Sequence, residues 1–237
     1  MTSPAFTEQL EARIAKYDLL CHPFYKAWAA GELTREELRA YATEYYPQVA
    51  AFPGHLQRLA LRTQDAALRG ALLMNRADEM GAEDAGGRPH EELWLDFAEG
   101  MGAAREEARR QKPLPEVAEL IAHFRRMAHE GSPAEALAAF YAYESQVPRV
   151  AREKARGLRE LYGADARACG YFTLHQTADV HHARVWKQQL ERELATQPEL
   201  AENALESAQA TAQALWRTLD GIERRRQERK RVVAAAL

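Results

Sequence analysis

Residues 171–186 read YFTLHQTADVHHARVW and place His175, Asp179 and His182 at spacings of four and three. On an α-helix these steps add to about 700°, so the three side chains point within about 20° of one direction. Two imidazoles and a carboxylate on one helix face suit a divalent transition metal such as iron or manganese. A polar helix face that happens to contain histidines is the alternative, so other segments must supply the missing ligands.

The neighbouring pair His181 and His182 can be separated by the same geometry. His181 follows His175 by six residues, or about 600°, and therefore points some 120° away from the shared face. The spacing predicts that His182 is the ligand and that His181 lies behind the ligands or in solvent.

The length and composition of the chain indicate one helical domain. With 237 residues it can bury a substantial core. Only 13 Gly and 10 Pro interrupt a sequence dominated by Ala, Leu, Glu and Arg, which are strong helix formers. Because no repeat, low-complexity tract or linker divides it, we expect a single domain over residues 1–237, with a basic C-terminal tail at 222–237.

Charge, cysteine content and hydropathy argue against several functional classes. A net charge of −3 gives no general reason to expect binding to nucleic acid or to a membrane. The two cysteines form no motif, which is typical of a reducing compartment. No apolar run approaches the roughly 20 residues of a membrane span, and the N-terminal segment does not resemble a signal peptide. We therefore expect a cytoplasmic protein.

Helical periodicity runs through nearly the whole chain, and no alternating pattern indicates a strand. We expect an all-α bundle of seven to eight helices. The helical pattern extends over residues 5–17, 22–28, 34–63, 64–82, 90–102, 115–130, 133–161, 165–192 and 197–229. Pro47 and Pro53 should bend or break the third segment, because proline lacks an amide hydrogen. The basic tail could contact an acidic surface, but a solvated, frayed helix end is favoured.

Glu144 is the best single candidate for a further ligand. Two metal ions that share bridging carboxylates need about six ligands from facing helices of a bundle. Glu144 lies among aromatic and β-branched residues, where an unpaired carboxylate is costly. Pro148 follows four residues later and displaces the hydrogen bond to the Glu144 carbonyl, which predicts a local helix distortion there. The alternative is a carboxylate at the edge of the apolar stripe.

Three other side chains are weaker candidates. His90 begins the segment HEELW and could be a ligand or merely a capping or surface histidine. Glu79 and Glu83 lie one turn apart at the end of the preceding helix, and periodicity does not choose between them.

Five segments together resemble the family of the chlamydial protein associating with death domains. The segments are residues 19–53, NRADEMG (75–81), PHEELWLDFAEGMG (89–102), YAYESQVPRVAREKARGLRELYG (141–163) and residues 171–186. The resemblance that they carry extends over nearly the whole chain apart from the C-terminal tail. The resemblance implies the haem-oxygenase-like fold, housing two metals, either two irons or a manganese–iron pair, that activate dioxygen.

The resemblance also implies a full set of ligands. Carried over motif by motif, the metal ligands fall on Glu79, His90, Glu144, His175, Asp179 and His182. The loop between Glu79 and His90 is about four residues longer than the family pattern, and an alignment shifted to Glu83 restores the shorter spacing. Glu79 is preferred because Asn75, Asp78 and Gly81 keep the surrounding pattern.

The activity implied by the resemblance is formation of para-aminobenzoate for folate biosynthesis by oxidative cleavage of the enzyme's own tyrosine. The sacrificed tyrosine falls on Tyr25, another tyrosine of the site on Tyr41, and a lysine that donates the amino group on Lys154. Each chain would then act only once. The implied cofactors are two transition metal ions, with dioxygen as co-substrate and an external reductant. Related folds often dimerise, which leaves a homodimer open.

Two other functions stay open. A conventional multiple-turnover dimetal oxidase of a small amine, amino acid or fatty acid would use the same ligands. A non-catalytic protein-interaction module is suggested by the family's name, but six metal-binding side chains in a core are costly without metals.

Overall fold

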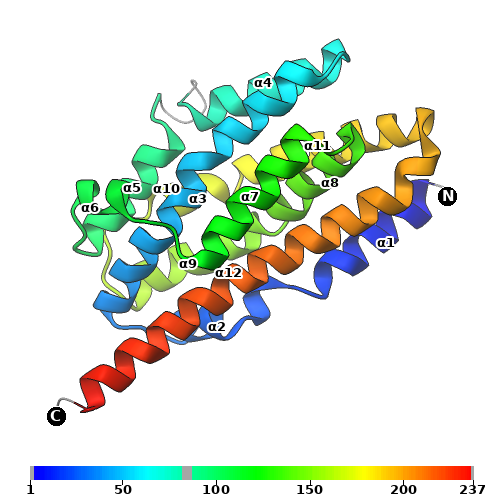
Figure 1. Cartoon of the computed structure of the whole chain (residues 1–237). Helices are drawn as coiled ribbons and strands as arrows, with labels where there is room; N and C mark the ends of the chain where they lie inside the picture. Colours follow the sequence, from blue (N-terminus) through cyan, green and yellow to red (C-terminus); the bar gives the residue numbers. More distant parts are fainter. Residues whose placement is uncertain (1–2, 82–86, 236–237) are drawn as a thin grey trace.

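The computed structural model describes residues 3–81 and 87–235, and within these ranges the chain is helical with no strand (Figure 1). This confirms the expected all-α fold. The α-helices are α1 (Ser3–Ala15), α2 (Pro23–Ala29), α3 (Arg35–Arg62), α4 (Ala66–Glu79), α5 (His90–Gly100), α6 (Arg105–Arg110), α7 (Pro115–His129), α8 (Pro133–Glu144), α9 (Val147–Glu160), α10 (Gly170–His175), α11 (Ala178–Thr196) and α12 (Ala201–Ala235).

The expected number of seven to eight helices is wrong, because two long segments are divided and residues 105–110 form the additional short helix α6. The segment 133–161 forms two helices, α8 and α9, which meet just after Glu144. The segment 165–192 forms α10 and α11, separated by Gln176 and Thr177. The backbone amide and the hydroxyl of Thr177 both bond the carbonyl of Leu174, at 3.1 and 3.2 Å, which tightens the chain into a turn.

Helix α3 remains continuous over 28 residues. It begins with the capping box that the sequence suggests, in which Thr34 and Glu37 each bond the other's backbone amide. Pro47 and Pro53 both lie inside the helix, so of the two expected outcomes, a bend or a break, the break does not occur.

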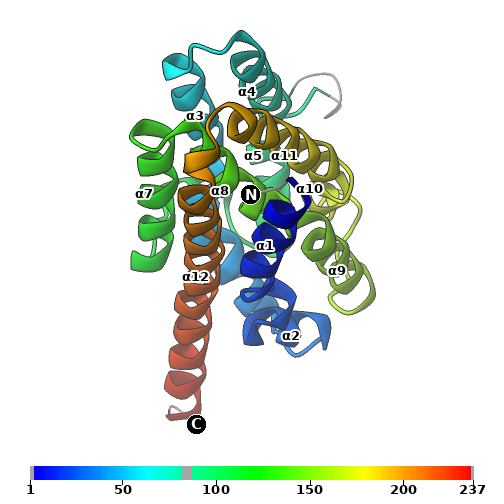
Figure 2. The same ribbon diagram turned by 90° about the vertical axis from the view of Figure 1, so that its right-hand side faces the viewer.

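Helix α8 forms the centre of the bundle, and α7, α11 and α12 pack around it (Figure 2). Residues 136–144 are all buried. A helix that is apolar on every side is buried on every side, and its many alanines let neighbouring helices approach closely. Because Glu144 ends this helix, its carboxylate lies in the interior of the bundle.

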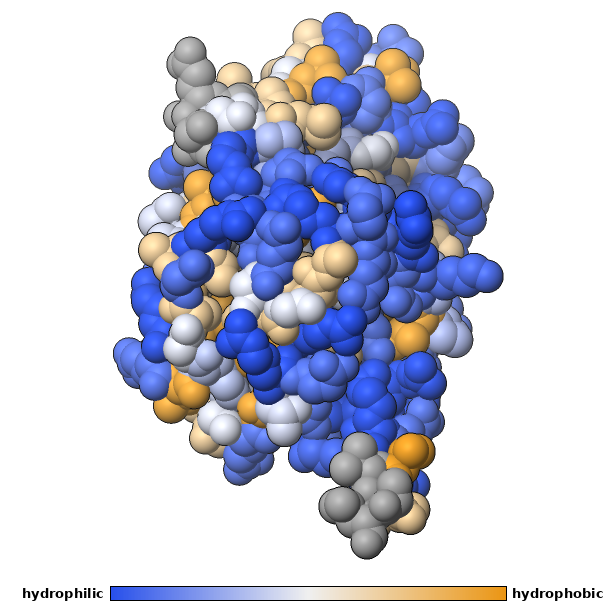
Figure 3. Space-filling view, turned by 90° about the vertical axis from the view of Figure 1, so that its left-hand side faces the viewer, coloured by the Kyte–Doolittle hydropathy of each residue, from blue (hydrophilic) through white to orange (hydrophobic). Residues whose placement is uncertain are grey.

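The surface carries scattered apolar side chains rather than a continuous patch on the face shown in Figure 3. Single exposed apolar residues such as Leu61 and Met74 are ordinary in a folded protein. Within residues 3–81 and 87–235, no helix is both long and apolar enough to cross a bilayer.

The basic end of α12 packs against acidic residues of α3. Arg226 is buried, and its Nη1 lies 3.5 Å from Glu37 Oε1. Arg229 donates a hydrogen bond of 2.8 Å to the carboxylate of Glu44. This part of the segment is therefore held by ion pairs within the chain, and the expectation of a frayed, solvated end is wrong for it.

Gly157 allows α9 to approach α2 closely. A Cβ atom at this position would lie 2.9 Å from both Cδ1 and Nε1 of Trp28, which is itself only 1% exposed. The indole Nε1 donates a hydrogen bond of 3.4 Å to the carbonyl of Lys154 on α9. The contact thus sets where Lys154 lies relative to α2.

We expect Gly157→Ala to destabilise the protein by about 1–3 kcal/mol, because Trp28 has no free space into which to move. Gly70→Ala on α4 is the matched control, since a Cβ there meets no atom within 4 Å. The control should raise the free energy of unfolding by about 0.4–1 kcal/mol, because alanine lowers the conformational entropy of the unfolded chain. Urea unfolding measures both, and equal stability of the two variants would contradict the proposed contact.

Candidate metal centre

Six buried side chains converge between α4, α5, α8, α10 and α11. Their exposed fractions are all 7% or less. They form two groups whose ligand atoms lie within 4.8 Å of one another, Glu79 with His90 and His175, and Glu79 with Glu144 and His182. Asp179 is hydrogen-bonded to His182, with 3.3 Å between Oδ1 and Nδ1. Glu79 belongs to both groups and is therefore suited to bridge two ions.

Helix ends deliver these side chains to one place. Glu79, Glu144 and His175 are the last residues of α4, α8 and α10, whereas His90 is the first of α5. Asp179 lies in the first turn of α11. Because these helices end at the same place, space remains between them for the six side chains. A helix that continued through this place would fill that space.

A local distortion at Glu144 was predicted from Pro148, and the structure shows that the helix ends at this residue. The Glu144 carboxylate is held by its neighbours. Trp186 Nε1 donates a hydrogen bond to one oxygen, and Asn75 Nδ2 lies 3.5 Å from the other. These contacts fix the carboxylate without neutralising its charge.

The donor set fits a pair of first-row transition metal ions. Three imidazoles and three carboxylates supply the nitrogen and oxygen ligands that iron and manganese accept. His90 Nδ1 lies 3.0 Å from Glu79 Oε2, yet among the described residues it has no hydrogen-bond partner. A metal ion could bind between this nitrogen and this oxygen, because the two atoms lie close together without a hydrogen bond between them.

Burial makes the cluster electrostatically costly. It raises the pKa of Glu144 well above its usual value, and the charges of Asp179 and Glu79 oppose the stabilising charge of His182. For His182, burial opposes protonation, but the hydrogen bond to Asp179 and the charge of Glu144 raise its pKa to about 10. Buried carboxylates without matching positive charge destabilise a fold, and divalent cations would supply that charge.

The alternative ligand Glu83 falls outside the described residues. His181 is exposed, and its Nδ1 lies 3.1 Å from Arg184 Nη2 rather than in either group. The separation of His181 from His182 by helical spacing therefore agrees with the geometry, although the spacing was reckoned along an unbroken helix.

The second set of candidates, Tyr25, Tyr41 and Lys154, lies together in an adjacent cavity of about 40 Å³. The hydroxyls of Tyr25 and Tyr41 are 3.2 Å apart, and Lys154 Nζ hydrogen-bonds to the hydroxyl of Tyr41. The same amine lies 4.3 Å above the centre of the Tyr25 ring. On an unbroken helix Lys154 would point away from Glu144, but it belongs to α9 and approaches from another direction.

Burial sets the protonation of this second group. It lowers the pKa of the Lys154 amine well below its ordinary value, with aromatic rings around it. It also raises the pKa values of the Tyr25 and Tyr41 hydroxyls. The group therefore consists of two protonated phenols and an amine that is readily uncharged.

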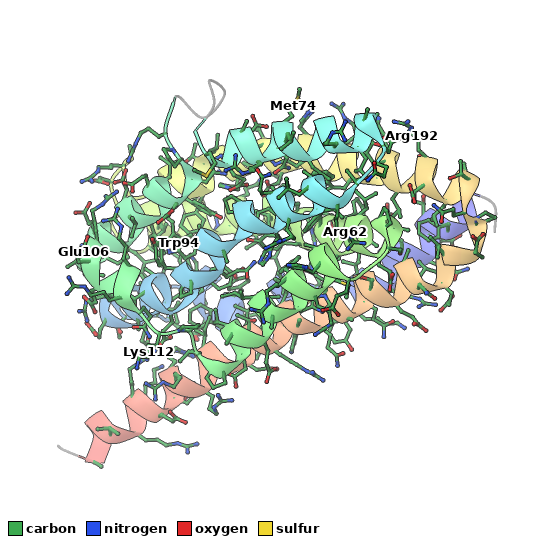
Figure 4. The ribbon with its side chains drawn as sticks, turned by 45° about the horizontal axis from the view of Figure 1, so that its top comes forward. Arg62, Met74, Trp94, Glu106, Lys112 and Arg192 are labelled. Atoms are coloured by element: carbon green, nitrogen blue, oxygen red, sulfur yellow. The ribbon has the colours of Figure 1, made fainter. Side chains whose placement is uncertain are left out.

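Tyr143 and Tyr171 separate the two sites and line both. The Tyr171 ring stacks on His175, with 3.9 Å between centroids. Trp94 of α5 lies inside the bundle (Figure 4) and packs edge-on against Tyr171, 4.9 Å between centroids. Tyr171 lies four residues before His175 and Tyr143 directly before Glu144, a signal that sequence reasoning passed over because aromatic residues are common in cores.

The sequence was compared with those of known proteins. The family of iron-containing redox enzymes matches residues 39–216. A 4-aminobenzoate synthase of Chlamydia trachomatis is 39% identical over 218 residues, which cover 92% of this chain and 91% of that protein. A 4-aminobenzoate synthase of Nitrosomonas europaea is 36% identical over 232 residues, covering 94% and 92%. The resemblance inferred from the sequence motifs is confirmed.

A solved structure supports the fold independently. A domain of unknown function with a haem-oxygenase-like fold from Shewanella denitrificans superposes with a TM-score of 0.79. The alignment covers 96% of this chain and 94% of that one, at 19% sequence identity. The haem-oxygenase-like fold expected from the sequence is confirmed.

We expect Glu144→Gln to stabilise the protein in EDTA and to reduce its stabilisation by metal. A carboxyl whose folded pKa is raised stabilises the fold most at low pH, and this contribution is lost as pH rises above its ordinary 4.5. Glutamine keeps an acceptor for Trp186 without the charge. At pH 8 the melting temperature should therefore rise by about 2–4 °C for each kcal/mol recovered.

Calorimetry with and without Mn²⁺ measures both effects. Metal at 100 times its Kd should stabilise the wild type by about 2.7 kcal/mol. Glu119→Gln, an exposed change on α7, should behave as the wild type. A lower melting temperature for Glu144→Gln than for the wild type in EDTA at pH 8 would contradict the electrostatic cost assigned to Glu144.

Proposed function

The chain belongs to the family of iron-containing redox enzymes, and we propose that it forms 4-aminobenzoate, the para-aminobenzoate used in folate biosynthesis, from its own Tyr25. The reaction would use two transition metal ions (two irons, or manganese with iron), dioxygen and an external reductant. Lys154 would supply the amino group. Support for the product comes from relatives described as 4-aminobenzoate synthases, which align over more than nine-tenths of both chains.

The position of Lys154 over Tyr25 is the observation that carries the proposal. An amine 4.3 Å from the ring centre is held beside the carbon atoms to which nitrogen must be attached. A protonated ammonium has no lone pair for this step, so the lowered pKa of Lys154 favours the reactive form. No other described lysine is buried.

The size of the Tyr25 cavity supports an internal substrate. About 40 Å³ accommodates a water molecule or two, whereas pockets for small-molecule substrates measure several hundred Å³. An external amine, amino acid or fatty acid would need side chains to move before it could enter. Tyr25, in contrast, already lies in the cavity wall, so the conventional multiple-turnover oxidase is disfavoured.

Tyr41 links the two reacting groups. Its hydroxyl contacts both the Tyr25 hydroxyl and Lys154 Nζ. The phenol to be oxidised and the amine therefore share one hydrogen-bonding partner, and the amine keeps the lone pair that it needs to attack the ring. The hydroxyl also holds the amine in place above the ring of Tyr25.

The metal ligands would be Glu79, His90, Glu144, His175, Asp179 and His182. When bound, the metal ions would supply the capacity to activate dioxygen and to accept electrons from a phenol. Tyr143 and Tyr171 stand between that centre and Tyr25, and with Trp94 they exclude water from the space between the two sites. The same nitrogen and oxygen ligands accept iron and manganese, which is why both pairings fit.

Ring-labelled tyrosine tests the source of the product. When protein made with ¹³C-ring tyrosine is loaded with metal, reduced and exposed to dioxygen, we expect ¹³C-labelled 4-aminobenzoate, with no more than a single molecule per chain. Mass spectrometry should show a matching loss confined to the peptide that contains residue 25. Tyr25→Phe should give no product, whereas Tyr17→Phe, outside both cavities, should give the wild-type yield.

Lys154 is tested in the same way with ¹⁵N-lysine. The product should carry ¹⁵N, and Lys154→Met, which keeps the length of the side chain but lacks the amine, should form none. Unlabelled product, or continued turnover with an added substrate and unchanged protein mass, would refute the self-consuming reaction while leaving the metal centre intact.

A further inference from the structure

His182 is held on both edges of its ring, unlike the other two histidines of the metal centre. Its Nδ1 lies 3.3 Å from Asp179 Oδ1 and 3.7 Å from Glu144 Oε1. Its Nε2 lies 3.2 Å from Asp78 Oδ2. The edge that carries Nδ1 therefore faces the carboxylates of the centre, and the opposite edge faces Asp78.

The other two histidines are held differently. His175 Nδ1 is 2.7 Å from the carbonyl oxygen of Tyr171, an acceptor without charge, which leaves Nε2 for a metal. His90 Nδ1 points at Glu79 without a hydrogen bond. Only His182, of the three, has a carboxylate outside the ligand set at its second nitrogen.

Asp78 occupies a position from which it can influence the centre without entering it. It precedes Glu79 on α4, its side chain is 20% exposed, and it belongs to neither group of converging ligand atoms. It lines an open cavity of about 190 Å³ together with His90, His181 and His182. Its carboxylate thus lies on the outer side of the His182 ring.

We propose that Asp78 is a positioning residue that makes the two metal positions unequal. By accepting the Nε2–H of His182, Asp78 would hold the ring, once a metal ion is bound, in the tautomer whose Nδ1 lone pair faces the group that contains Glu144. The position formed by Glu79, Glu144 and His182 is then the tighter one, and the position formed by Glu79, His90 and His175 the weaker. The inference rests on the metal centre of the proposed function, but not on the identity of its product.

The physical basis is the effect of an outer carboxylate on a ligating imidazole. A carboxylate that accepts the far N–H fixes the ring orientation and makes the ligating nitrogen more basic. Loss of such a partner typically costs about 10–100-fold in metal affinity. A neutral carbonyl, as at His175, fixes the ring but adds less basicity.

Titration of metal-free protein with Co²⁺, followed by its visible absorption, tests the inequality. Wild-type protein should bind two ions in two distinguishable phases. Asp78→Asn keeps an acceptor but not the charge and should weaken the tighter phase by about 10-fold, and Asp78→Ala should approach 100-fold. The weaker phase should be unchanged in both variants.

His181→Gln is the matched control, because His181 lines the same cavity, is exposed and belongs to neither ligand group. It should bind both ions as the wild type does. Wild-type affinities in Asp78→Asn and Asp78→Ala, or equal weakening of both phases, would overturn the proposal. Binding of fewer than two ions by the wild type would overturn the metal centre as well.

A second measurement uses the wild-type protein, so that the test does not depend on whether the Asp78 variants fold. In ¹⁵N-histidine NMR spectra of wild-type protein loaded with Zn²⁺, His182 should carry its proton on Nε2, and His175 on Nδ1. A His182 protonated on Nδ1 would overturn the role of Asp78. Neither readout uses 4-aminobenzoate, so failure of the self-consuming reaction leaves this test unaffected.

Discussion

Three carboxylates and three imidazoles buried at one point are the constraint on which the rest of the structure depends. Glu144 carries the heaviest cost, because it ends α8, the helix enclosed on every side. Its pKa is raised by burial and by the neighbouring Asp179 and Glu79, so the fold alone does not neutralise the cluster. Burying these carboxylates destabilises the fold unless cations balance their charge, and a protein keeps such a cluster where its function requires it.

The same arrangement places the proposed metal centre beside its proposed target. Helices that end at the metal ligands leave the neighbouring space to aromatic rings, and Tyr143 and Tyr171 line both cavities. Gly157 brings α9 against Trp28, and Lys154 on α9 thereby reaches the ring of Tyr25. The close packing of Gly157 against Trp28 thus supports the geometry of the groups that we propose to react.

Sequence reasoning succeeded where a local pattern decides the outcome. Helical spacing separated His182 from His181, and Pro148 predicted a distortion of the helix at Glu144. It failed where tertiary packing decides. The turn at Thr177 follows from local hydrogen bonds in a stretch without a strong helix breaker, and the segment 133–161, expected as one helix, is in fact divided. Asp78 was passed over because exposed carboxylates are common, and its contact with His182 depends on how α4 and α11 pack.

Anomalous diffraction from crystals of the metal-loaded protein, recorded at the iron and manganese edges, tests the central claim most directly. The structure predicts two peaks, both in contact with Glu79, one also bound by His90 and His175 and the other by Glu144 and Nδ1 of His182. A single peak, or peaks away from these side chains, would contradict the dimetal centre and the chemistry proposed to depend on it.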